Sequence, residues 1–209
     1  MNSQQSATDF GHLLGGKFPG LSDKQLQAHI ELYRGYVKKT NEIETELAKI
    51  PPNEANYSYA AYSELQRRRA VPYNGARLHQ LYFENLSPTK THPGKNLLAA
   101  IEACFGSFEK WTEDLRGGLM SAHGWVLLTQ SRMDGLLRNN VIEEHHRGIM
   151  VEEMIILAVD GWEHAYMIDY GINKKEYIKT VENLLNWDVA TERFESIQMM
   201  LKGPKTAAA

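Results

Sequence analysis

The sequence has little cysteine, no long apolar run and almost no excess charge. It contains one cysteine, Cys104, so no disulfide can form within the chain, and a reducing compartment such as the cytoplasm is expected. Its longest apolar stretches, such as residues 155–159, are too short to cross a membrane. Because 23 Lys and Arg face 26 Asp and Glu, the net charge of −3 gives no reason to expect nucleic acid or a membrane surface as a partner.

The sequence also lacks the marks of targeting and of repetition. Its first residues show neither the basic segment nor the apolar core of a signal peptide. No internal repeat is visible, and the only low-complexity tract is the three alanines at 207–209. With 209 residues, 43% of them hydrophobic and 23% charged, the composition is that of a globular protein large enough to bury a core.

The first half of the chain is expected to be helical. Glycines and a proline within residues 1–20 disfavour a regular element and predict a flexible N-terminal arm. Ser22 is the expected N-cap of a long helix that runs to about Lys49, because apolar residues recur there at helical spacing. Pro51 and Pro52 then end that helix.

Two further helical stretches follow in the first half. The polar-rich segment 57–69 is expected to stop before Pro72, and the segment 76–86 carries an apolar stripe of its own. Together with the first helix they predict a helical hairpin domain over residues 21–90. The prolines, threonines and glycine between Leu86 and Asn96 mark the best linker in the sequence.

The second half changes its periodicity and predicts an α+β domain over residues 95–202. Residues 97–115 indicate one or two helices broken near Gly106. Three β-favouring runs follow, the first two separated by a hairpin-like turn at 131–135, before the chain returns to helical character. These runs are 125–130, 136–142 and 155–160, and the closing helical segments are 174–185 and 189–200.

Histidine is the residue type that most invites a functional interpretation. Four of the eight histidines, at 12, 92, 145 and 146, fall in expected loops, where a solvated side chain is the favoured interpretation. His29 and His79 lie near the apolar stripes of two helices, where a lone histidine is more often a satisfied core residue than a ligand. Asp160 and His164 stand four residues apart at the end of an apolar strand and can converge on one point. Two such pairs would give imidazole and carboxylate ligands suited to iron, manganese or zinc, although the spacing is common by chance.

The segment around these last two residues resembles a known signature. Asp160-Gly-Trp-Glu-His-Ala-Tyr166 is similar to the D-x-W-E-H-A-Y motif of the iron/manganese superoxide dismutase family. The resemblance continues in the family's order over about residues 20 to 200. Its further matches are residues 22–29, Tyr36-Val37, His79-x-x-Tyr-Phe83, Asn85-Leu86, the segment 105–110, Tyr170-Gly171, Lys175-x-Tyr177, Asn186-Trp187 and Arg193-Phe194.

The resemblance implies a fold, a cofactor and a reaction. The fold would be a helical hairpin joined to an α+β domain with a three-stranded antiparallel sheet. One iron or manganese ion per subunit would lie where the two meet, and superoxide would be converted to dioxygen and hydrogen peroxide. A homodimer or a higher homo-oligomer is implied as well. The implied metal ligands are His29, His79, Asp160 and His164.

Other positions of this sequence match residues that surround the metal in the family. Trp125 and Trp162 match the aromatic residues that surround the metal in the family. The alternative, that they are ordinary buried aromatic residues, differs little from this interpretation. Glu163 is expected to reach across a two-fold axis and accept a hydrogen bond from the partner subunit's His164; taken alone, it is a surface carboxylate at a helix start. Tyr36 matches the gateway tyrosine, and Tyr33 is its expected neighbour, where the family more often has histidine.

Three departures from the family pattern bear on the site. Tyr36 follows His29 by seven residues instead of eight, which keeps both on one face of a regular helix. Met167 stands where a second tyrosine is common. The family's glutamine beside the metal is missing, so His123 is the candidate for its hydrogen-bonding role; the alternatives are that His123 caps a strand or faces an access channel.

Two other functions compete with the enzyme. A catalytically silent relative could keep the fold as a structural or assembly module, and a zinc ion could occupy the site without redox activity. The complete ligand set favours the enzyme, because a scaffold has no need to bury three imidazoles and a carboxylate together. The choice between iron and manganese stays open at this point.

Overall fold

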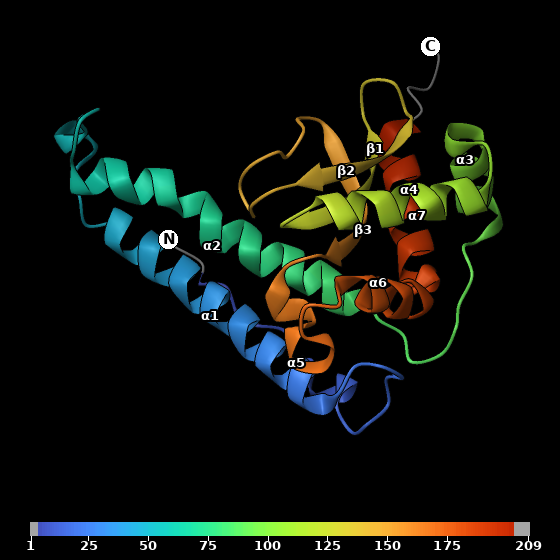
Figure 1. Cartoon of the computed structure of the whole chain (residues 1–209). Coiled ribbons are helices and arrows are strands. Elements are labelled where there is room, and N and C mark those ends of the chain that lie inside the picture. Colours follow the sequence, from blue (N-terminus) through green and yellow to red (C-terminus); the bar gives the residue numbers. More distant parts are fainter. Residues whose placement is uncertain (1–3, 203–209) are drawn as a thin grey trace, which may run out of the picture.

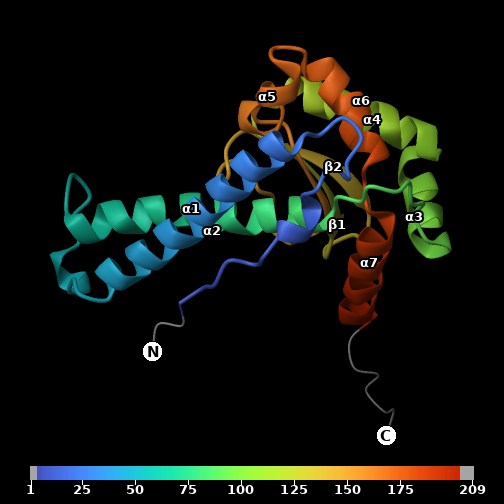
Figure 2. The same cartoon turned by 90° about the horizontal axis from the view of Figure 1, so that it is seen from below.

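A hairpin of two long helices forms the first half of the protein. In the computed structural model, which describes residues 4–202, α1 (Asp23–Leu47) and α2 (Ala61–Glu84) lie side by side and antiparallel, and their connecting loop projects away from the rest of the molecule (Figures 1 and 2). That loop contains the short 3-10 helix η2 (Pro52–Glu54). The predicted N-cap of α1 is confirmed, because Ser22 Oγ accepts a hydrogen bond of 3.1 Å from Gln25 N.

The second helix does not end before Pro72, as the sequence had led us to expect. The segments 57–69 and 76–86 were expected to be separate, whereas α2 continues through a buried Pro72 and begins only at Ala61. A proline inside a helix removes one backbone hydrogen bond and costs about 3 kcal/mol. The 24 residues of α2 pack along α1 and the core, and this packing outweighs that loss. Local sequence rules cannot predict it, because the contacts are with distant parts of the chain.

The N-terminal segment also differs from the sequence-based expectation, because it packs against the hairpin instead of forming a loose arm. Phe10, Leu13 and Phe18 are all buried, and the 3-10 helix η1 (Gly11–Leu13) lies among them. Thr8 N donates a hydrogen bond of 2.9 Å to Tyr33 Oη. These three buried apolar side chains hold the segment against the hairpin, although its glycines alone had suggested a flexible backbone. Residues 1–3 of the predicted arm lie outside the described residues.

The second half has the expected α+β order. Helices α3 (Lys95–Phe105) and α4 (Phe108–Ser121) are separated at Gly106, whose φ of +90° favours glycine, so the predicted break is confirmed. Strands β1 (Trp125–Ser131), β2 (Leu137–Ile142) and β3 (Glu153–Asp160) follow. The chain then forms the 3-10 helix η3 (Glu163–Ala165) and ends in three helices, α5 (Met167–Tyr170), α6 (Lys174–Asn183) and α7 (Trp187–Lys202).

The sheet brings the hairpin, β1 and β3 together. Its order is β2-β1-β3 with both pairings antiparallel, as expected, and the register sets Trp125 opposite both Ile142 and Asp160. Helices α3 and α4 contact the β1–β2 side, while α2 and α7 contact β3. The end of β3 therefore points Asp160 at the hairpin. Among residues 4–202, no helix combines the length and the apolar character needed to cross a membrane.

The segment between the two halves is held on both sides. Ser87 N donates to Leu184 O at 2.7 Å, and Thr91 Oγ1 donates to Leu185 O at 2.9 Å. The buried side chains of the hairpin and of the sheet belong to one continuous core. The division into domains 21–90 and 95–202 stays a prediction, whereas the α+β architecture is confirmed.

Candidate metal centre

Four side chains from four different elements meet in the core between the hairpin and the sheet. His29 comes from α1, His79 from α2, Asp160 from the end of β3 and His164 from η3. One potential ligand atom of each lies within 4.8 Å of all the others. The first three residues are buried and His164 is partly exposed. The structure thus brings together the four residues that the family resemblance implied.

The distances between these atoms fit a shared ion better than hydrogen bonds alone. Asp160 Oδ2 lies 3.1 Å from His29 Nε2, 3.1 Å from His164 Nε2 and 3.6 Å from His79 Nε2. His79 Nε2 and His164 Nε2 are 3.2 Å apart. Ligand atoms that each lie about 2.0–2.2 Å from one ion are separated by about this distance. The donor set therefore fits a single metal ion.

Local contacts fix which atoms face the centre. His79 Nδ1 donates a hydrogen bond of 2.6 Å to Gly75 O, which leaves Nε2 as the free ring nitrogen. Asp160 Oδ1 accepts from Trp162 N at 2.9 Å, so its other oxygen, Oδ2, faces the histidines. Tyr177 Oη donates to the main-chain carbonyl of Asp160 at 2.7 Å and holds the end of β3 in place.

Burial and neighbouring charge set the protonation of the four groups. Burial lowers the pKa of His29 and lowers the pKa of His79 well below its usual value, which keeps both imidazoles neutral. Burial raises the pKa of the Asp160 carboxyl, but His164 and His29 outweigh burial and hold that pKa below its usual range. For His164, burial lowers the pKa and the Asp160 carboxylate raises it by more. The neutral imidazoles of His29 and His79 and the Asp160 carboxylate suit an iron or manganese cation, whose binding would release any proton that His164 carries.

A chain of three aromatic side chains lies against this centre. Trp125 Nε1 donates a hydrogen bond of 3.0 Å to His145 Nδ1. Because an indole N–H can only donate, His145 carries its proton on Nε2 and donates to Tyr36 Oη at 2.8 Å. The Tyr36 and His145 rings lie with their centroids 5.2 Å and 5.6 Å from that of His79. The hydroxyl proton of Tyr36 is then free to point elsewhere.

The histidine that contacts Tyr36 is His145. From the sequence, His123 was the candidate for the hydrogen-bonding role of the missing glutamine. His123 is exposed just before β1, whereas His145 is 5% exposed. His145 had been interpreted as a solvated loop residue. One signal could have found it: the 131–135 turn makes β1 and β2 antiparallel, so the loop after Ile142 returns to the start of β1 at Trp125.

A glycine on α2 makes room for Tyr36. A Cβ at Gly75 would lie 2.8 Å from Tyr36 Cδ1, too close for any side chain. On the regular helix α1, the seven-residue spacing keeps Tyr36 on the face of His29, as expected. Gly75 therefore allows the Tyr36 ring to approach α2 closely, within hydrogen-bonding distance of His145.

The remaining expected site residues lie at the edge of the centre. Tyr33 is buried under the N-terminal segment, with its ring 6.0 Å from that of Phe83. The Trp162 ring stacks on His164 at 6.1 Å, and its buried Nε1 has no hydrogen-bond partner among the described residues. Glu163 is exposed, and Met167, 45% exposed, lies nearby at the start of α5.

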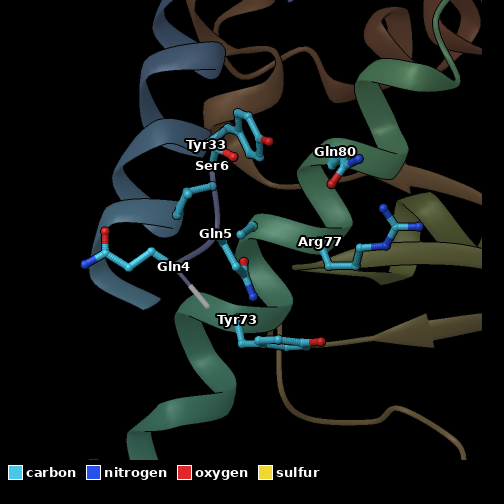
Figure 3. Close-up of a pocket in the computed structure, with 9 residues that line it drawn as sticks. Gln4, Gln5, Ser6, Tyr33, Tyr73, Arg77 and Gln80 are labelled. Atoms are coloured by element: carbon cyan, nitrogen blue, oxygen red, sulfur yellow. The ribbon is translucent and has the colours of Figure 1, made fainter. Parts of the chain in front are cut away.

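Tyr33 also lines a polar cavity of about 380 Å³ (Figure 3). Residues 4–6, α1 and α2 line it, and the Arg77 side chain extends away from residues 4–6. None of the four candidate ligands lines this cavity, so it is separate from the centre.

Comparison with known proteins agrees with the geometry. The sequence profile described as iron/manganese superoxide dismutases, C-terminal domain, matches residues 93–193. The chain is 34% identical over 189 residues to superoxide dismutase [Fe] of Aquifex pyrophilus, covering 88% of this chain and 89% of that protein. It is 33% identical over 181 residues to superoxide dismutase [Mn] 1 of Halobacterium salinarum, covering 85% and 88%. Superoxide dismutase [Fe] of Cupriavidus metallidurans is 34% identical over 182 residues, covering 85% and 90%.

Proposed function

Because the chain belongs to the iron/manganese superoxide dismutase family, we propose that it is a superoxide dismutase with one iron or manganese ion per subunit. His29, His79, Asp160 and His164 hold that ion, and the convergence of their four ligand atoms within 4.8 Å is the observation that carries the proposal. When bound, the ion supplies one-electron chemistry, so that one superoxide is oxidised to dioxygen and a second, with two protons, is reduced to hydrogen peroxide.

Tyr36 is the group best placed to handle protons for this reaction. Its oxygen accepts from His145, so its own O–H can donate toward an anion beside the ligands. Burial and the Asp160 carboxylate raise the pKa of Tyr36, which keeps the hydroxyl protonated at neutral pH. Burial lowers the pKa of His145 to about 4, so this imidazole stays neutral and its tautomer stays fixed by Trp125. We assign to His145 the hydrogen-bonding role that the sequence suggested for His123.

The surrounding rings restrict what can reach the centre. Tyr82 and Phe83 pack on His29 at 5.1 Å and 4.9 Å between ring centroids, and Trp125 packs on His79 at 5.0 Å. Of the four ligands only His164 is partly exposed, so access runs past its ring and that of Trp162. We infer that access limited to this side admits a small anion and excludes larger ones. Tyr33, on the far side, supports the packing of α1.

We also propose that two copies of this chain associate around Glu163. Its exposed carboxylate is adjacent in sequence to His164, and Trp162 Nε1 is buried without a partner among the described residues. A two-fold axis here would let Glu163 accept a hydrogen bond from the partner subunit's His164 and orient that ligand. The single cysteine supports a cytoplasmic location.

The rival function, a silent structural relative, has less support. A structural module would gain nothing from three imidazoles and a carboxylate in the core, where unpartnered polar groups are destabilising. The relatives cited include proteins named for iron, at 34% identity, and for manganese, at 33%, so either ion is proposed.

Loading the protein with one metal at a time tests the proposal. Metal-free protein is given Fe²⁺ or Mn²⁺, and its metal content and its rate of superoxide removal are measured. We expect one ion per subunit and activity with at least one metal, and we expect Asp160→Ala and His164→Ala to lose both. His12→Ala, which changes an exposed histidine outside the set of candidate ligands, is the matched control. Metal retention with normal turnover in Asp160→Ala would refute the ligand assignment.

A further inference from the structure

Gln25 is a buried polar residue on α1 with no part in the metal site or the proton chain. It is 1% exposed and lies four residues before His29, one turn away on the same face of the helix. Its Nε2 donates a hydrogen bond of 2.6 Å to His164 O, and its Oε1 accepts one of 3.1 Å from Ile168 N. One amide thus connects α1 to the main chain on either side of the η3–α5 junction.

The segment that receives these bonds has little internal support. His164 belongs to η3, which has three residues, and α5 adds only four more. So short a segment cannot fix its own orientation through internal hydrogen bonds. By contrast, α1 has 25 residues and is anchored along α2. The position of the His164 main chain, from which its imidazole projects, is therefore set largely by what binds it from outside.

A second contact acts in the same direction at the start of α1. Ser22 N donates to Asp169 Oδ2 at 2.7 Å, and the Ser22 hydroxyl in turn accepts from Gln25 N at 3.1 Å. Ser22 and Gln25 therefore both hold the start of α1 against α5. Of the two, Gln25 is the one bonded directly to a proposed metal ligand, His164.

We propose that Gln25 is a positioning residue of the metal centre, whose side-chain amide holds His164 at the correct distance from His29. The inference rests on the proposed function, since it takes the four residues to be ligands of one ion. Its consequence is that Gln25 controls how tightly and in what geometry the ion is held, although it touches neither the ion nor an imidazole.

The chemistry of the contact explains why an amide stands here. Glutamine offers one donor and one acceptor at the end of a side chain of this length, and the two bonds use one of each. In Gln25→Glu a carboxylate of the same size would face the carbonyl of His164 with no proton to donate. In Gln25→Met both main-chain groups would lose their side-chain partner with little change in volume.

A purely structural role and a positioning role give different results in a metal titration. The probes are Co²⁺, whose visible absorption reports ligand geometry, and Mn²⁺, whose dissociation constant is measured against a competing chelator. The matched control is Gln27→Met on the same helix, because exposed Gln27 donates its side-chain hydrogen bond to Glu31 of that helix, at 2.8 Å. Folding of each variant is checked by circular dichroism.

We expect wild type and Gln27→Met to share one Co²⁺ spectrum and to bind Mn²⁺ with equal affinity. Gln25→Met and Gln25→Glu should shift the Co²⁺ absorption and weaken Mn²⁺ binding by about 10–100-fold, as for other residues that orient a metal ligand. If one of the two variants does not fold, the other provides the comparison. Folded Gln25 variants with an unchanged spectrum and affinity would overturn the inference alone. A wild-type protein that binds neither ion would overturn the proposed function, and this inference with it.

Discussion

At the residue scale, the direction of two hydrogen bonds decides what Tyr36 can do. The Trp125 Nε1–H group can donate a hydrogen bond but cannot accept one, so it fixes the tautomer of His145. His145 in turn donates to Tyr36 Oη, which therefore acts as an acceptor. The hydroxyl proton is then left for the centre. A glutamine could perform the same relay, and His145 provides it here with a ring that burial keeps neutral.

The first prediction concerns that hydroxyl. Tyr36→Phe should keep its metal but lose roughly tenfold or more in turnover at high superoxide, with a changed pH above which activity falls, because the proton donor is gone. Metal content and a pH–rate profile check this, with the fully exposed Tyr57→Phe as the control. If turnover and profile match those of wild type, Tyr36 only packs against α2.

The second prediction concerns His145 and pH in the metal-free protein. Its pKa is about 4 when folded and near 6.5 when unfolded, so between these values the unfolded state binds the extra proton. Stability should therefore fall as the pH drops from 6.5 toward 4. Urea unfolding at pH 7 and pH 5 should show a smaller loss for His145→Gln than for wild type, by at most about 2 kcal/mol. An unchanged loss in His145→Gln would contradict the buried, neutral imidazole, and His12→Gln is the control.

At the element scale, the sequence was most informative where local rules decide the outcome. Ser22, Gly106 and the 131–135 turn mark a helix start, a helix break and a strand reversal, and each feature is found. It was least informative where distant contacts decide. The N-terminal segment is held by burial of Phe10 and its apolar neighbours, and the loop carrying His145 is held by Asn74 Nδ2, 2.9 Å from His145 O and 71 residues away.

The candidate site divides in the same way. The four ligands could be found because they stand within a recognisable family motif or on helix faces that the apolar stripe defines. The loop between β2 and β3 has no regular spacing that places His145, so only the antiparallel pairing of β1 and β2 could have indicated its position. The expectation of a helix end at Pro72 was wrong because packing along the whole of α2 outweighs the local cost of a proline inside the helix.

The third prediction concerns the packing of the two hairpin helices. Gly75→Ala would place a Cβ 2.8 Å from the Tyr36 ring, so the ring must move away from His145. We expect a loss of about 1–3 kcal/mol in stability and a fall in turnover like that of Tyr36→Phe. Gly35→Ala on α1 is the matched control, since a Cβ there meets nothing within 4 Å and should stabilise the helix by about 0.5–1 kcal/mol. Equal effects at the two glycines would refute the role of the close contact at Gly75.

At the scale of the whole molecule, the metal centre joins the two halves of the chain. The hairpin supplies His29 and His79, and the α+β half supplies Asp160 and His164. Binding an ion to all four therefore stabilises the arrangement of both halves. The exposed side of the centre carries Glu163, through which the proposed dimer would connect ligand orientation to assembly.

The fourth prediction concerns that assembly. Glu163→Ala should weaken the homodimer and lower metal occupancy together, because a two-fold interface loses two bonds with one substitution. Analytical ultracentrifugation and elemental analysis on the same samples check this, with the exposed Glu54→Ala at the hairpin loop as the control. A monomeric wild type with full activity would rule out the proposed bridge, as would a Glu163→Ala dimer with unchanged metal content.

The most direct measurement of the central claim is the rate of superoxide removal as a function of ions bound per subunit. Metal-free protein is titrated with Fe²⁺ or Mn²⁺, and rate and metal content are determined for each sample. The account predicts, for at least one metal, a straight line from zero that ends at one ion per subunit, and no such line in Asp160→Ala. A fully loaded wild type that leaves superoxide untouched with both metals, or a metal-free protein that removes it as fast, would contradict the account.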